Sequence, residues 1–145
     1  MGLYGDPAAL DALADRLASL AGQLRDHATD HVRAAAAAHW VSVAADEFRA
    51  RVAQETTRVD DAADALDAAA ARLRAHAQQV RDLIAEIAGI EHAATSWFSD
   101  QLHGLEHAAD HLPWRELGGP FAWPASGYKA WLEVGAFLRG HGVLA

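Results

Sequence analysis

The chain has 145 residues, and 52% of them are hydrophobic, which is enough for one domain with a buried core. Its net charge of -8 comes from 20 acidic and 12 basic residues, so no basic stripe is available to neutralise nucleic-acid phosphates. The lack of cysteine excludes disulfide bonds. No signal-peptide pattern and no apolar run of about 18 residues is present. We therefore expect the chain either to stay in the cytoplasm or to be exported without a classical signal peptide.

The N-terminal part of the sequence predicts a helix over about residues 7–38. Asp6 can accept hydrogen bonds from the free N–H groups of the first turn, and Pro7 suits the first helical position. Large apolar residues then recur at alternating spacings of three and four, which marks a packing seam, at Leu10, Leu13, Leu17, Leu20 and Leu24.

A second helix is predicted over about residues 43–88 or longer, with Ser42 as its N-cap. Its seam has the same spacing and runs through Phe48, Val52, Glu55, Val59, Ala62, Leu66, Ala69, Leu73, His76, Val80, Leu83, Ile87, Ile90, Ala94 and Trp97. Gly89 is a possible break, since glycine costs about 1 kcal/mol relative to alanine inside a helix.

If the chain doubles back at Val41, the two helices form an antiparallel hairpin with Trp40 as a plug at its tip. Leu20 then faces Ala62, and Leu13 faces Ala69, so that large residues meet small ones. Each seam is interrupted by a polar residue, His27 in the first helix and Glu55 in the second, and the same register places these two opposite each other. We therefore predict a hydrogen-bonded or ionic pair between them.

The first helix is too short to cover the second beyond about residue 75. The second helix therefore has uncovered apolar residues at Val80, Leu83, Ile87, Ile90 and Trp97. We expect these residues, together with Trp131 of the tail, to form an interface. After Pro113 the chain is rich in proline, glycine and aromatic residues, and Ser126 can cap a short helix with Trp131, Val134 and Leu138 on one face. This tail either covers the exposed stripe or docks onto a partner.

Three histidines recur every four residues and share one helical face, namely His103, His107 and His111. Imidazoles at this spacing can share Zn²⁺ or Cu²⁺, and residues 103–107 match H-x-x-E-H, an inverted zinc-protease pattern. A thin hairpin offers no evident substrate cleft, and Gly104 weakens the helix. We therefore predict no enzyme, no catalytic residues and no cofactor, and keep metal binding by a His-rich helical protein as a weaker alternative.

The tip carries a resemblance to a known family. The segment Trp40-Val41-Ser42 with Phe48, between two long helices, resembles the turn of the WXG100 (ESAT-6-like) family of type VII secretion proteins, and residues 5–10 are similar to actinobacterial members. The likeness covers roughly residues 1–90. It implies a helical hairpin that pairs, as a homo- or heterodimer, into a four-helix bundle and leaves the cell folded through the type VII machinery.

The sequence departs from the family pattern at two places. Ser42 replaces the turn glycine, which suits an N-cap but gives less access to positive φ. The family's export signal, Tyr followed four residues later by an acid, is also altered, because Tyr128 is followed by Leu132 at that place and by Glu133 one residue later. The signal is then either displaced or carried by the partner.

Together these patterns predict an all-α chain with a helical hairpin over residues 1–112 and a tail over 113–145. A partner or the C-terminal segment would complete the four-helix bundle. We expect a secreted or secretion-associated type VII protein that acts by associating with itself or with a small WXG100-like partner. The alternative is a cytoplasmic adaptor or chaperone for a type VII export substrate.

Overall fold

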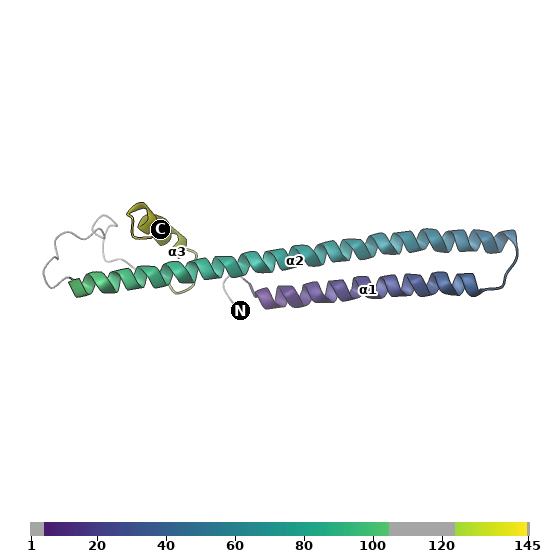
Figure 1. Ribbon diagram of the computed structural model, residues 1–145, viewed down its shortest axis with the longest axis horizontal. Coiled ribbons are helices and arrows are strands. Elements are labelled where there is room, and N and C mark those ends of the chain that lie inside the picture. The colour runs from purple at the N-terminus through teal and green to yellow at the C-terminus, as the bar shows by residue number, and fades with distance from the viewer. Residues whose placement is uncertain (1–4, 105–123, 145) are drawn as a thin grey trace. The chain divides into compact units, whose positions relative to one another are not determined.

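The computed structural model describes residues 5–104 and 124–144. In these residues the chain forms three helices and no strand, and the helices are α1 (Pro7–Ala37), α2 (Val43–Gly104) and α3 (Trp131–Gly140). Helices α1 and α2 pack against each other as an antiparallel hairpin (Figure 1). The predicted all-α hairpin is confirmed.

The chain divides into two compact units, and α2 belongs to both. One unit spans Asp6–Gln79, and the other contains Val80–Ala145 with Met1–Gly5. The predicted boundary between residues 112 and 113 lies outside the described residues.

The helix starts follow from local chemistry, as predicted. The Asp6 carboxylate accepts a hydrogen bond from Ala8 N at 2.9 Å, and Pro7 occupies the first helical position. Ser42 Oγ accepts from Ala45 N at 3.1 Å and caps α2. Helix α2 continues through Gly89, so the possible break at that residue does not occur.

The seam of the hairpin is made mostly of alanines, together with the buried Val52, and this corrects the predicted register. The residues at its centre recur every seven positions and are Ala14, Ala21, Ala28 and Ala35 in α1 and Ala63, Ala70 and Ala77 in α2. Leu13 and Leu20 remain 45% and 48% exposed, and Ala62 is also exposed. The predicted facing of Leu20 with Ala62 is therefore wrong by one residue.

The physical reason is the size of the alanine side chain. Alanines at the contact line let two helices approach closely, whereas leucines there would hold the axes apart and leave gaps beside the small residues. The leucines flank the seam instead.

The predicted pair between His27 and Glu55 is not formed. Both side chains are exposed and line one shallow groove with Leu24 and Val59. In the described part of the chain, neither residue has a hydrogen bond or ion pair. Exposed polar groups can form hydrogen bonds with solvent, so neither side chain needs a partner within the chain.

The C-terminal unit has its own hydrophobic core, formed where α3 lies on α2. Its buried residues are Ile87, Ile90, Ala94, Trp131 and Leu138. Half-buried residues complete it, namely Leu83, Trp97, Leu132, Val134, Phe137, Val143 and Leu144. The C-terminal segment therefore covers the stripe on α2.

The ends of α3 differ from the sequence-based expectation at one point. Ser126 does not cap the helix, because Ala130 is the N-cap residue and has no side-chain cap bond. At the other end, Gly142 has φ 72°, and Val143 N donates to Leu138 O at 2.9 Å, which completes a Schellman motif with Gly142 N bonded to Arg139 O.

Among the helices described, none is both long and apolar enough to cross a membrane.

Candidate functional site

The hairpin presents two unlike faces on either side of its alanine seam. Successive helical residues are about 100° apart, so the residues before and after a buried alanine point to opposite sides. Asp15 follows Ala14, and Asp64 follows Ala63; both form ion pairs across the two helices. Leu13 precedes Ala14 and therefore lies on the other side.

The ion-pair face joins α1 to α2 through two arginines. Arg25 Nη2 lies 2.6 Å from Asp64 Oδ1 and 2.8 Å from Asp67 Oδ2, and Arg74 Nη2 lies 2.8 Å from Asp15 Oδ1. The hydrogen bonds to Asp64 and then Asp67 raise the pKa of the Arg25 guanidinium above its usual value. Because these groups are exposed, their ion pairs contribute little to the free energy of unfolding and act mainly to fix how α1 and α2 are aligned with each other.

We call the opposite side the leucine face. Leu13 and Leu20 form an exposed ridge on α1, and Ala62 and Ala69 form a strip of small residues on α2. Half-buried apolar residues lie between ridge and strip, at Leu10, Leu17, Leu24, Val59, Leu66 and Leu73. Ridges of large residues beside strips of small ones suit helix-to-helix packing.

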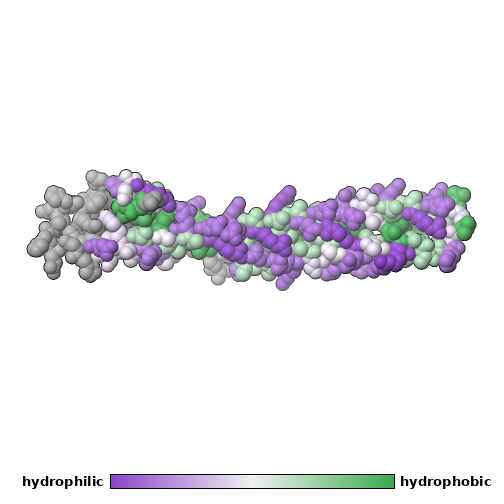
Figure 2. Space-filling view, viewed as in Figure 1, coloured by the Kyte–Doolittle hydropathy of each residue, from purple (hydrophilic) through white to green (hydrophobic). Residues whose placement is uncertain are grey.

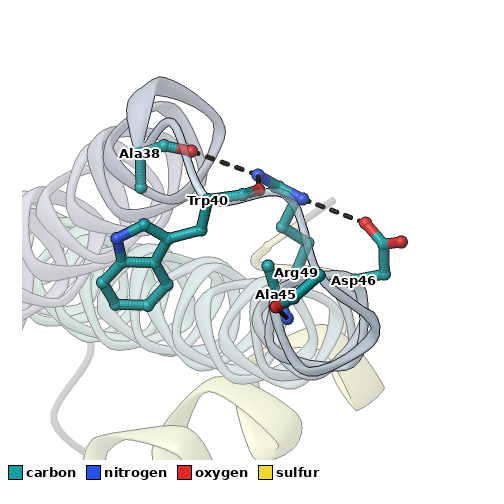
Figure 3. Close-up of polar contacts among 6 residues, drawn as sticks. Ala38, Trp40, Ala45, Asp46 and Arg49 are labelled. Carbon is teal, nitrogen blue, oxygen red and sulfur yellow. Dashed lines mark hydrogen bonds and ion pairs between the residues drawn. The ribbon is translucent and has the colours of Figure 1, made fainter.

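The tip loop is held by Arg49, a residue that the sequence did not single out. Its Nη2 atom donates to Ala38 O at 3.1 Å and to Trp40 O at 2.8 Å, and its Nη1 atom lies 3.0 Å from Asp46 Oδ1 (Figure 3). A guanidinium can bridge several acceptors because it carries five donors in one plane. Arg49 thus ties the end of α1 and the loop to the first turns of α2.

This loop does not use the left-handed conformation that favours glycine. In the described residues, positive φ occurs only at glycines, and none of these lies in the tip. Ser42 therefore needs no positive φ at this place, and its side chain supplies the cap.

Apolar side chains are exposed at the tip. Trp40 is 64% exposed and Val41 is 99% exposed, and hydrophobic residues are visible at this end of the hairpin (Figure 2). The Trp40 and Phe48 rings contact each other with centroids 6.2 Å apart. Trp40, expected as an aromatic plug at the tip, is therefore largely exposed in the single hairpin, because the loop lies beyond Ala35, the last alanine of the α1 seam.

The residues predicted as an interface are placed within the C-terminal unit. Val80, Ile87, Ile90 and Trp131 are buried, and Leu83 and Trp97 are half-buried against the same core. Tyr128 is 46% exposed in the turn before α3, and Glu133 is exposed in the first turn of that helix.

The histidine triplet is only partly within the described chain. His103 lies in the last turn of α2, while His107 and His111 lie outside the described residues. Within residues 5–104 and 124–144, no three His, Cys, Asp or Glu residues are grouped to hold a metal ion.

Sequence reasoning missed the alanines and Arg49 for different reasons. The seven-residue recurrence of Ala14, Ala21, Ala28 and Ala35 was a usable signal, but leucines dominate any ranking by hydrophobicity. The bonds of Arg49 go to backbone carbonyls, which every residue carries, so no sequence pattern marks them.

Comparison with known proteins gives one match. Residues 3–97 match the family described as "Putative T7SS secretion signal domain". No curated protein and no solved structure gives a significant match. The family match confirms the predicted association with type VII secretion, while the narrower WXG100 assignment stays a prediction. Because the match covers well over half of the chain and includes α1, the tip and α2 as far as Trp97, the protein belongs to this type VII secretion signal domain family.

Proposed function

We propose that the protein is exported by a type VII system as a folded helical hairpin and acts by protein–protein association rather than by catalysis. The observation that carries the proposal is the contrast between the two faces of the hairpin. On one face, charged side chains of α1 and α2 are paired with each other within the chain. The other face exposes two leucines beside a strip of alanines.

The leucine face suits a second copy of the chain as its partner. In a two-fold pair, the ridge of Leu13 and Leu20 of each copy would pack against the strip of Ala62 and Ala69 of the other. Burying the exposed parts of these leucines in both copies is worth roughly 3–6 kcal/mol before the cost of association. This pairing would complete a four-helix bundle.

The tip is the best candidate for recognition during export. Trp40 and Val41 are exposed although both are hydrophobic, and Arg49 fixes the backbone that carries them. A fixed loop loses little entropy on binding, so exposed aromatic residues on it can contribute strongly to an interface.

Export can be measured in culture supernatants from cells with and without a functional type VII apparatus. We expect wild-type protein outside the cell only with the apparatus. Trp40→Ala should reduce export several-fold while changing the free energy of unfolding by less than about 0.5 kcal/mol, since the side chain is largely exposed. Val32→Ala, at another exposed residue of the hairpin, should be exported normally.

The same experiment tests the alternative of a cytoplasmic adaptor for an export substrate. Retention of the wild type in the cytoplasm under both conditions would favour the adaptor. Normal export of Trp40→Ala would contradict recognition through the tip.

A further inference from the structure

The second half of α2 carries an apolar stripe whose occupant in this chain is α3. We define the α2 stripe by six residues, Val80, Leu83, Ile87, Ile90, Ala94 and Trp97. They recur at spacings of three, four, three, four and three, which is the pattern of one face of a packed helix.

Helix α3 fits the stripe at a point of close backbone approach. A Cβ atom added at Gly135 would lie 2.6 Å from Ile90 Cδ1 and 3.0 Å from Ile90 Cγ1. Trp131 and Leu138 lie on either side of this glycine along α3 and are buried. The contact therefore depends on a residue without a side chain at its centre.

Among the described residues, two exposed polar contacts join α3 and the turn before it to α2. Arg139 Nη2 lies 3.4 Å from Glu86 Oε1, and Gly127 N donates to Glu91 Oε2 at 3.2 Å. Exposed pairs of this kind typically contribute less than about 1 kcal/mol. Helix α3 is therefore held on the α2 stripe mainly by its apolar contacts.

The α2 stripe is also complementary to itself. Its spacing reads the same in both directions, so an antiparallel second copy would place Val80 opposite Trp97 and Leu83 opposite Ala94. Ile87 would face Ile90 at the centre. Large residues meet small ones in the outer layers, as interdigitating helices require.

We propose that α3 is an autoinhibitory contact. It covers the α2 stripe from Leu83 to Trp97 and thereby prevents this stripe from pairing with the same stripe of a second copy. The cover acts within one chain, so its high effective concentration favours it over the pairing of two molecules. Displacement of α3 opens an association surface distinct from the leucine face.

The test uses the full-length chain carrying Leu13→Gln and Leu20→Gln, which removes association through the leucine face and separates this proposal from the proposed function. Gly135→Leu is added to displace α3, with Leu138→Asp as a second displacing variant. Gly140→Leu is the matched control, because Gly140 belongs to the same helix and a Cβ atom there meets nothing within 4 Å. Sedimentation equilibrium gives the association constant, and hydrogen exchange of the α3 amides reports displacement.

In both displacing variants, the α3 amides should lose their protection from hydrogen exchange. These variants should also self-associate at least about tenfold more tightly than the Gly140→Leu control. The reason is that the apparent affinity of a covered site equals its intrinsic affinity multiplied by the fraction of molecules in which the site is uncovered. Adding Ile87→Glu to the Gly135→Leu chain should abolish this association. Displacement without tighter association would overturn the proposal, as would association that survives Ile87→Glu. Full α3 protection in both displacing variants would also overturn the proposal, because a cover that neither change displaces cannot control access to the α2 stripe.

Discussion

Ala63→Leu is expected to destabilise the hairpin by about 1–3 kcal/mol, the usual cost of forcing a larger side chain into a packed contact. Ala63 is fully buried at the point where α1 and α2 approach each other. Three additional carbon atoms at this position must push the helices apart or bend one of them. Because this part of the seam consists of small alanines, neighbouring seam residues such as Ala21 and Ala70 would lose contacts as well.

Ala62→Leu is the matched control, since Ala62 is the preceding residue and is exposed on the leucine face. Both changes are measured in chains that also carry Leu13→Gln and Leu20→Gln, so that pairing through the leucine face does not contribute. In that background Ala62→Leu should alter the free energy of unfolding by no more than about 0.5 kcal/mol. Denaturation followed by circular dichroism gives both values. Equal effects at the two positions, or a larger effect at Ala62, would restore the leucine-centred register and reject the alanine seam.

Ile87→Ala should cost about 2–5 kcal/mol in the C-terminal unit, because it removes a buried side chain and leaves a cavity. Ile87 is 1% exposed and is the largest fully buried side chain among the described residues. Its loss weakens the surface on which Trp131 and Leu138 pack. Hydrogen exchange of the α3 amides measures the expected drop in opening free energy.

Ile84→Ala serves as the comparison for this change, since Ile84 lies one turn earlier on α2 and is 41% exposed. It should lower the opening free energy of α3 by less than about 1 kcal/mol. An Ile87→Ala chain whose α3 amides keep wild-type protection would show that α3 is not held by this core.

The existence of the helices and the starts of α1 and α2 were predictable because they depend on local chemistry. Asp6 with Pro7, and Ser42 by itself, bond to N–H groups within a few residues. The rotation of each helix about its axis depends on which residues the partner helix approaches. Either the leucines or the alanines of α1 could face the partner helix. The alanines, such as Ala14 and Ala21, lie at the contact with their equivalents on α2, because they allow the two backbones to approach closely.

The candidate site was predicted in position but not in detail. Trp40, Ser42 and Phe48 do lie at the tip, yet Trp40 is exposed and its loop is fixed by Arg49. The covering of the α2 stripe by Trp131 was one of two sequence-based alternatives. The close contact of Gly135 with Ile90 could not be foreseen, because it depends on how two segments far apart in sequence meet.

The central claim is that the leucine face, rather than the ion-pair face, associates with a second hairpin. Sedimentation equilibrium of the purified chain tests it most directly. The wild type should dimerise, Leu13→Gln/Leu20→Gln should be monomeric at the same concentration, and Asp15→Asn/Arg74→Gln on the opposite face should dimerise as the wild type does. A monomeric wild type, or dimerisation that is lost only in the ion-pair variant, would contradict the claim.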